Sequence, residues 1–334
     1  MRGCGNVALS LCGVLMFAGC AGRTRMPGVS YSGPLPGATR LEVELRDNLR
    51  RHVDVLARTI GERNRERPLA YQQAAAYIAE RFHDAGYAPS LLQERRVDGG
   101  LVHNVVAELP GTNRRSEILI VGAHYDSEKD CPGANDNASG VAALIELARL
   151  CADRPLPRTV RFVAFYDEEL FGPRPMGSQV YAAEARRRNE NIIGMISLET
   201  IGYYSDSPKS QGYPFLFKLF FPGYPGSGNF VAFVGNHASG GFVCQAIASF
   251  RAHVSFPSQG LIAPWFVVDA GRSDQVGFWQ QGYPGCMVTD TAEFRYPFYH
   301  TRDDTAENLD YDRTARVVEG LAGVIRDLAS GRGN

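Results

Sequence analysis

The sequence lacks the features that mark several large classes of protein. Its 334 residues carry a net charge of only −1, so the clustered basic surface of a nucleic-acid-binding protein is not indicated. It has no internal repeat and no long low-complexity stretch. Hydrophobic residues make up 44% and charged residues 21%, a balance that excludes a disordered chain and is ordinary for a water-soluble globular protein.

Long hydrophobic runs are also missing, except at the amino terminus. One run follows Arg2 and covers about Val7 to Gly19, which is too short to span a bilayer and is typical of a signal peptide. It ends in Phe17-Ala18-Gly19-Cys20, which resembles a bacterial lipobox whose cysteine becomes the lipidated first residue.

We therefore expect a signal peptide at 1–19 and a lipid-anchored tether at 20–40, rich in Gly, Pro, Ser and Arg. The protein would then attach to its membrane partner through the lipid on Cys20. Ala21 after the cysteine favours the outer membrane, by resemblance to lipoprotein sorting, with the protein facing the periplasm. An ordinary secretory signal is the alternative.

Cysteine pairs with metal-binding spacing are absent. The sequence holds no CxxC, which argues against a thiolate zinc site. Beyond residue 20, four cysteines remain: Cys131, Cys151, Cys244 and Cys286. In an oxidising compartment two disulfides are possible, and the sequence leaves their pairing open.

Hydrophobic periodicity predicts strands and helices in alternation. Expected strands cover 101–109, 117–123, 159–165, 192–198 and 229–234, and expected helices cover 41–64, 70–85, 137–152, 177–188 and 311–329. This order indicates an α/β fold with three layers, in which helices cover both faces of a mixed, largely parallel central sheet. Because no linker follows residue 40, we expect a single domain over 41–334.

Residues 203–228 break this rhythm. They are rich in Gly, Pro, Tyr and Phe and have no clear period. A stretch of this length within a compact domain is usually functional, so we expect it to form a wall of a substrate pocket.

Acids and histidines stand where the predicted strands end. His124-Tyr125-Asp126, Asp167-Glu168-Glu169 and Glu199 follow three successive strands, and His300 precedes the last helix. Ligands of open α/β sheets bind at the carboxyl ends of the strands. Neighbouring carboxylates repel one another and need compensating positive charge, yet no Lys or Arg interrupts these segments. A pair of divalent cations would supply that charge.

Five motifs in order now identify a resemblance: GAHYDS, GANDNASG, YDEE, SLETIGYY and YHTRDDT. Over roughly 70–330 the chain resembles the two-zinc exopeptidases of peptidase clan MH, which include bacterial leucyl aminopeptidases and glutamate carboxypeptidase-type enzymes. The resemblance implies a fold of the zinc-peptidase type.

The resemblance implies a set of metal ligands when it is carried over position by position. His124 and Glu199 would bind one zinc ion, Glu169 and His300 the other, and Asp136 would bridge the two. The family more often has Asp where this chain has Glu199. Relatives also have a cis peptide bond directly after the bridging Asp, so we expect one between Asp136 and Asn137. Zinc accepts His nitrogen and carboxylate oxygen.

Two further residues receive catalytic roles from the resemblance. Glu168 would be the general base, taking a proton from the attacking water and passing it to the leaving amine. Tyr299 corresponds to a Tyr that donates to the oxyanion in the carboxypeptidase-like relatives; an ordinary wall residue is the alternative.

Other acids are candidates for supporting roles. Asp126 stands two residues after His124, on the same strand face, and is expected to accept from the imidazole N–H. Asp304 is a candidate for the same role near His300. Asp290 is expected either to support the site or to bond only locally. Ser273-Asp274 resembles a family segment beside the substrate side-chain pocket, where many relatives have His in place of Gln275.

The leading hypothesis is therefore a zinc-dependent exopeptidase with a peptide as substrate. Among exopeptidases, an aminopeptidase is favoured. Two alternatives stay open: a glutaminyl cyclase that uses one zinc ion on the same fold, and a non-catalytic binding protein. Metal content separates them, because the peptidase, the cyclase and the binding protein would hold two, one and no zinc ions.

Overall fold

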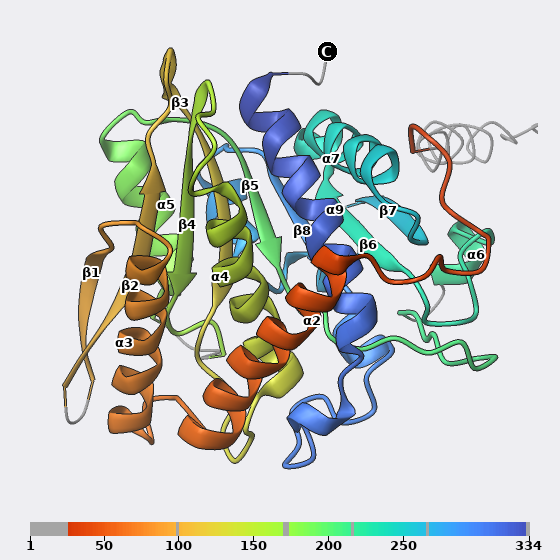
Figure 1. Ribbon diagram of the computed structural model, residues 1–334, viewed down its shortest axis with the longest axis horizontal. Helices are drawn as coiled ribbons and strands as arrows, with labels where there is room; N and C mark the ends of the chain where they lie inside the picture. The colour runs from red at the N-terminus through yellow and green to blue at the C-terminus, as the bar shows by residue number, and fades with distance from the viewer. Residues whose placement is uncertain (1–25, 98–99, 170–173, 215–216, 265–266, 332–334) are drawn as a thin grey trace, which may run out of the picture.

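The computed structural model describes residues 26–97, 100–169, 174–214, 217–264 and 267–331. The expected signal peptide, Cys20 and the first residues of the expected tether lie outside these ranges. Figure 1 shows a central sheet with helices packed around it.

One sheet forms the centre of the molecule, with strand order β1-β2-β4-β3-β5-β8-β6-β7. The strands are β1 Ser90–Val97, β2 Gly100–Leu109, β3 Arg114–His124, β4 Arg158–Phe165, β5 Asn191–Leu198, β6 Val231–Asn236, β7 Ser258–Ala263 and β8 Gly285–Thr289. The four central strands, β4, β3, β5 and β8, are parallel to one another. β1 and β2 add antiparallel pairings on one side, and β6 runs antiparallel to β8 on the other.

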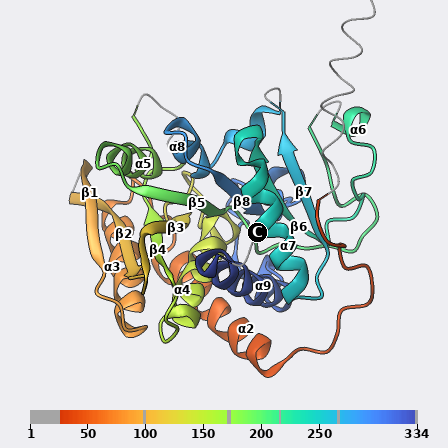
Figure 2. The same ribbon diagram turned by 90° about the horizontal axis from the view of Figure 1, so that it is seen from above.

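Helices cover both faces of this sheet, as Figure 2 shows from above. The α-helices are α2 Arg40–Val53, α3 Pro68–Asp84, α4 Gly140–Cys151, α5 Gly177–Arg187, α6 Phe217–Phe220, α7 Gly240–His253, α8 Gln275–Gln280 and α9 Tyr311–Ser330. α2, α3, α4, α7 and α9 lie on one face, and α5 and α8 on the other. The expected three-layer α/β/α fold with a mixed, largely parallel sheet is confirmed.

Short helical turns link several of these elements. η2 Asp54–Ile60 is π-helical, η3 Ala134–Ser139 is interrupted by the non-helical residues Asp136 and Asn137, and four are 3₁₀, η4 His237–Ser239, η5 Val268–Gly271, η6 Ala292–Phe294 and η7 Ala306–Asn308. η2 continues α2, so the long helix expected over 41–64 has an α part and a π part. The capping box at its start joins Thr39 and Glu42, whose side chains each accept from the other's backbone N–H.

Part of the segment expected to be a tether packs against the body of the protein. Met26 is buried, with its side chain over Gly260 of β7. Arg251 of α7 donates to the carbonyl oxygens of Met26, Pro27 and Gly28 at 3.3, 2.9 and 3.2 Å. The described chain is therefore attached to the α7–β7 side of the sheet from its first residue.

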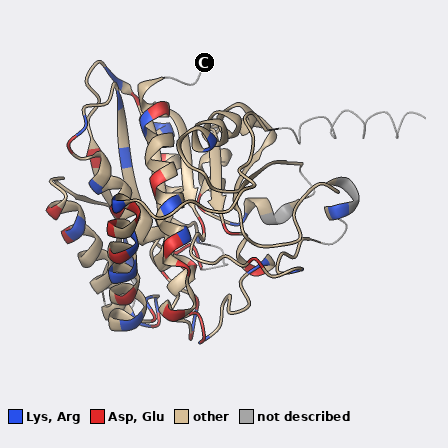
Figure 3. Ribbon diagram, turned by 45° about the vertical axis from the view of Figure 1, so that its right-hand side comes forward, with Lys and Arg blue, Asp and Glu red and all other residues tan. Residues whose placement is uncertain are grey.

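Acidic and basic residues are interspersed along the ribbon, as Figure 3 shows. The four described cysteines are all free, so the disulfides considered from the sequence are not formed. Cys131 Sγ lies 3.9 Å from Asp304 Oδ2, and Cys244 Sγ lies 4.0 Å from Met26 Sδ. Within the described ranges, no helix is long and apolar enough to cross a membrane.

Candidate active site

The parallel strands bring the expected site residues to one edge of the sheet. His124 ends β3 and pairs in register with Phe165 at the end of β4, so Glu168 and Glu169 follow close beside it. The backbone N–H of Glu199 bonds to Val288 of β8 at 2.9 Å, which fixes the residue that follows β5. This is the edge at which open α/β sheets bind ligands.

The imidazole of His124 faces several carboxylates. Its Nε2 lies 3.2 Å from Asp136 Oδ1, 3.1 Å from Glu199 Oε2 and 3.9 Å from Glu168 Oε2. Its Nδ1 lies 3.3 Å from Asp126 Oδ1. The ring is completely buried. Asp126 therefore stands where the sequence predicted it, on the ring nitrogen that faces away from the other acids.

A second imidazole faces the opposite oxygen of Asp136. His300 Nε2 lies 3.0 Å from Asp136 Oδ2 and 3.2 Å from Glu169 Oε2. The Asp136–Asn137 peptide bond is cis, as expected. Gly133, three residues earlier, has a left-handed φ of +62°, and a Cβ there would meet Asp136 O at 2.4 Å, so this turn requires glycine. Asp136 thus lies between two histidine–carboxylate groups.

This set of donors fits metal ions. Both ring nitrogens of His124, Asp136 Oδ1 and Glu169 Oε1 are buried without a hydrogen-bond partner. Donor atoms of His124, Asp136 and Glu199 lie within 4.8 Å of one another, as do those of Glu128, Glu169 and His300. Nitrogen and oxygen ligands at this spacing suit zinc.

Glu128 is a neighbour that the sequence analysis missed. Its Oε2 lies 3.9 Å from His300 Nδ1. It belongs to the loop that follows β3, two residues beyond Asp126. The signal in the sequence was its position close to Asp126, but the geometry of the loop decides which side chains turn toward the site.

The buried acids shift one another's pKa values. Burial raises the pKa of Glu168 well above its usual range, and Glu199 and Glu169 add to this effect. Burial and the charge of Asp136 raise the pKa of Glu169 to about 8. Burial opposes the charged form of His300, but Asp136 and Glu169 outweigh it and raise its pKa to about 10. The carboxylates therefore repel one another, and bound cations would relieve that repulsion.

Other acids hold the backbone around the site. Asp304 accepts from the backbone N–H groups of Asn135 and Asp136 at 2.7 and 3.1 Å, so it supports Asp136 and not His300, near which it was expected to act. Asp290 accepts from the Thr200 hydroxyl at 2.5 Å and from the Asn135 amide at 3.0 Å. It therefore joins the turn after β5 to the Asp136 segment. Of the two roles expected for Asp290, supporting the site or bonding only locally, the structure has the first.

Glu199 is held in place from two sides. Its Oε2 accepts from Ser273 Oγ at 3.0 Å and from Asn137 Nδ2 at 3.1 Å. Gln275, where many relatives have His, donates to Ala270 O at 2.9 Å and so braces its own loop. Asp274 is fully buried and does not line the pocket described next. Its neighbour Ser273 does line that pocket, so the segment Ser273-Asp274 lies beside it.

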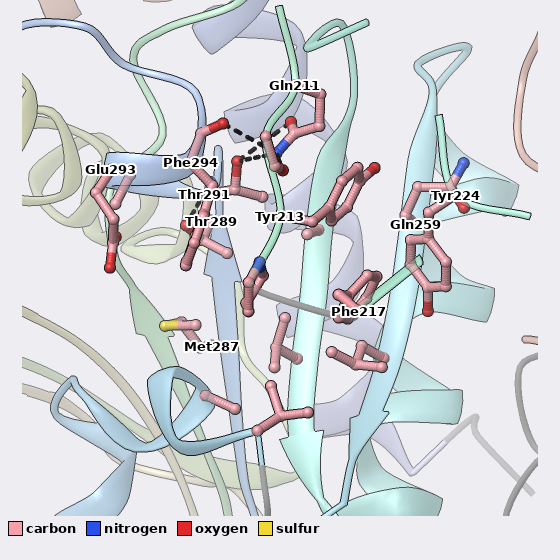
Figure 4. Close-up of a pocket in the computed structure, with 18 of the residues that line it drawn as sticks. Gln211, Tyr213, Phe217, Tyr224, Gln259, Met287, Thr289, Thr291, Glu293 and Phe294 are labelled. Carbon is pink, nitrogen blue, oxygen red and sulfur yellow. Dashed lines mark hydrogen bonds between the residues drawn. The ribbon is translucent and has the colours of Figure 1, made fainter. Parts of the chain in front are cut away.

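A pocket of about 840 Å³, including the space at its open mouth, extends from Glu199 and Tyr299. Figure 4 shows Tyr213, Phe217 and Tyr224 on one side and Met287 and the threonines of the β8 end on the other. Ala232 and Val234 of β6 and Leu261 of β7 add further apolar surface. Residues 203–228 therefore supply part of its wall, as expected.

Tyr299 stands between this pocket and the proposed metal ligands. Its ring stacks on His300 with centroids 3.8 Å apart and an interplanar angle of 16°. Burial, together with the charges of Asp136 and Glu169, raises the pKa of its hydroxyl. The phenol therefore stays protonated and can donate a hydrogen bond.

Comparison with known sequences now bears on this geometry. The sequence model of Peptidase family M28 matches residues 104–325. The chain belongs to this family. The identification made from the five motifs is thereby confirmed: the chain is a hydrolase of a zinc exopeptidase family.

Individual relatives agree with this placement. The chain is 37% identical over 286 residues to the uncharacterised protein YfbL of Escherichia coli, covering 82% of this chain and 86% of that protein. It spans about half the length of the fungal relatives described as probable zinc metalloproteases, at 28 to 29% identity.

Solved structures show the same fold. BSAP, a zinc aminopeptidase from Bacillus subtilis, superposes with a TM-score of 0.66 at 15% identity, over 89% of this chain and 96% of that one. A glutaminyl cyclase from Tannerella forsythia superposes with a TM-score of 0.60 at 20% identity, over 84% and 98%. At these identities the fold is what they share with this chain.

Proposed function

We propose that the protein is an aminopeptidase that uses two zinc ions. His124 and Glu199 would bind one ion, Glu169 and His300 the other, and Asp136 would bridge them. The observation that carries this proposal is the placement of Asp136, whose two oxygens lie 3.2 and 3.0 Å from the nitrogens of two different imidazoles.

Each remaining residue then has a chemical task. Zinc, when bound, polarises the scissile carbonyl and lowers the pKa of the attacking water. Glu168 lies 3.9 Å from His124 Nε2 and is not needed as a ligand, so it is placed to take the proton of that water and deliver it to the leaving amine. Burial raises the pKa of Glu168, which makes its carboxylate a stronger base. Tyr299 donates to the developing oxyanion.

The charge around the pocket favours binding of a free amino terminus. A substrate ammonium group needs a negative partner; Glu168 stands beside the proposed metal ligands, and Glu199 is one of those ligands. A carboxy terminus would need a cation. Arg272 lines the pocket, but its guanidinium is paired with Glu293 at 2.7 Å.

The pocket favours a large apolar first residue. Its walls are mainly aromatic and aliphatic side chains, and burying such side chains against each other is worth about 1.5–3 kcal/mol per large residue. We expect amino-terminal Phe, Leu or Met to be preferred over Glu or Lys.

The decisive experiment compares free and N-acetylated forms of short peptides that begin with Leu, Phe, Ala or Gln, together with the metal content of the purified protein. We expect about two zinc ions per chain and steep loss of hydrolysis on acetylation. Equal hydrolysis of the acetylated peptides would contradict aminopeptidase specificity. Ammonia release from the Gln peptide without peptide-bond cleavage would indicate a cyclase. Absence of both bound metal and turnover would indicate a binding protein.

We also propose that the protein is a lipoprotein of the cell envelope, anchored through Cys20 and facing the periplasm, with the outer membrane as its site. The lipobox-like sequence supports this localisation. The attachment of Met26 to Arg251 adds that only residues 20–25 would separate the anchor from the folded body.

A further inference from the structure

Arg63 lies behind the site, outside every motif considered above. Its side chain is fully buried. Nε donates to Tyr125 O at 2.8 Å, Nη1 to Pro132 O at 2.6 Å and Nη2 to Gly133 O at 2.7 Å. One guanidinium therefore joins the two ends of the loop that connects β3 to η3.

The backbone of Arg63 holds the same loop. Its N–H donates to Ser127 Oγ at 3.1 Å, and its carbonyl accepts from the Ser127 N–H at 3.2 Å. Tyr125 directly follows His124, and Gly133 stands three residues before Asp136. The contacts of Arg63 thus set the separation of two residues that we assign to the same metal ion.

The same segment reaches the other proposed ligands through Arg65. Its guanidinium makes two hydrogen bonds to Asp167, Nη2 to Oδ2 at 2.5 Å and Nε to Oδ1 at 3.2 Å. Asp167 has a left-handed φ of +58° and directly precedes Glu168 and Glu169. Tyr71 accepts from the Asp167 N–H at 2.7 Å, which holds this unusual backbone conformation.

Charge adds to the geometry. The described hydrogen bonds of the Arg63 guanidinium all go to backbone carbonyls, so its positive charge is not cancelled by a directly bonded carboxylate. It lies near the carboxylates of Asp126, Asp136 and Asp304, whose mutual repulsion it reduces. Arginine has five donors spread over the three nitrogens of a rigid fork and can bridge carbonyls that lie apart, whereas the three donors of lysine share one nitrogen.

We propose that the segment Gly61–Arg65 is a positioning element for the metal centre, in which Arg63 fixes the His124–Asp136 loop and Arg65 fixes the turn that carries Glu168 and Glu169. Neither arginine touches substrate in this arrangement. The inference rests on the proposed metal site, and metal content of the unaltered protein tests that site separately.

The test uses Arg63→Met, Arg63→Lys and Arg65→Met in the full-length protein. Arg67→Met is the matched control, because Arg67 lies two residues beyond this segment, is 63% exposed and pairs with Glu62 at 3.2 Å. For each variant, zinc affinity is measured by chelator competition. The values of kcat and KM are measured with a leucyl peptide, and the Tm of the metal-free protein is measured by thermal unfolding.

We expect Arg63→Met to weaken zinc affinity by about 10–100-fold, as for other residues that orient ligands. Arg63→Lys should restore part of that loss, because it returns the charge but not the fork. Arg65→Met should lower kcat by roughly 10-fold or more with little change in KM, because it disturbs the placement of Glu168. Arg67→Met should match the unaltered protein.

A purely structural role for Arg63 would give a different pattern. If Arg63→Met lowers the Tm of the metal-free protein but keeps unaltered zinc affinity and kcat, the proposal is wrong. Should Arg63→Met fail to fold, Arg63→Lys decides, since unaltered zinc affinity in that variant would also overturn it. If the unaltered protein binds no zinc, the proposed function fails first.

Discussion

The carboxylate of Asp126 accepts a hydrogen bond from the backbone N–H of Glu168 at 3.2 Å. Its other oxygen accepts from the N–H of Glu169 at 3.0 Å, and its Oδ1 lies 3.3 Å from Nδ1 of His124. One side chain directly after β3 therefore lies against the imidazole of its own strand and holds the backbone that carries the acid pair after β4. Glu168 is left with its side chain directed at the site and its backbone fixed.

This arrangement predicts that Glu168→Gln separates catalysis from metal binding. The amide has nearly the same shape but cannot take up a proton, so kcat should fall by about 10²–10⁴-fold while zinc content and Tm stay close to those of the unaltered protein. Glu80→Gln is the control, because Glu80 on α3 is 64% exposed and should have no effect. Loss of zinc from Glu168→Gln would show instead that Glu168 is a ligand.

The pocket predicts a change of specificity on Ala232→Phe. Ala232 lies on β6 and lines the pocket, so a ring there would fill space that a large first residue of the substrate needs. The ratio of kcat/KM for Phe- over Ala-initiated peptides should fall by about 10-fold or more. Ala248→Phe on α7 is the control, since Ala248 lies away from this pocket. An unchanged ratio would place the first residue of the substrate elsewhere.

The residues at the strand ends could be predicted from the sequence because their positions are set locally. A buried apolar run such as 117–123 must be a central strand, and parallel neighbours bring their carboxyl ends together. His124 and Glu199 are therefore neighbours by construction, although 75 positions separate them in the sequence. The cis bond after Asp136 came from the family resemblance alone, because nothing in the local residues requires it.

Other features depend on contacts that no periodicity records. β1 is an edge strand with mainly polar residues, α7 begins with two glycines and β7 has a glycine within it, and none of the three was expected. Arg63 bonds to backbone carbonyls, which every residue has, so its role leaves no trace in the identity of its partners. The pocket walls combine residues from 199 to 299 through packing that only the folded chain defines.

The lipobox-like sequence predicts that Cys20→Ser releases the protein from membranes. Serine has no thiol to accept lipid, so the protein should move from the membrane to the soluble fraction. Cys12→Ser is the control, because Cys12 lies in the expected signal peptide and should leave anchoring intact. Mass spectrometry that finds an unmodified mature terminus at another residue would refute the lipid anchor.

Glu146 lies away from the candidate active site, and its environment predicts how the stability of the protein depends on pH. It is 2% exposed and joins α4 to α2, accepting from Asn48 at 3.0 Å and from Arg149 at 2.9 and 2.8 Å. Burial would raise its pKa, but hydrogen bonds from His52, Arg149 and Asn48 outweigh burial and lower the pKa to about 2. The ionised form is thus preferred in the folded protein.

The sign of the pH effect follows from that shift. A carboxyl group with a depressed pKa in the folded state stabilises the protein above its unfolded pKa, near 4.5, and this contribution is lost as pH falls toward 2. Glu146→Gln should therefore lower the free energy of unfolding at pH 7 by about 2–3 kcal/mol, and the difference from the unaltered protein should shrink between pH 4.5 and pH 3. Urea unfolding at pH 7, 5, 4 and 3 measures this, with Glu80→Gln as control. A difference that stays constant across this range would mean that Glu146 contributes by packing and not by its charge.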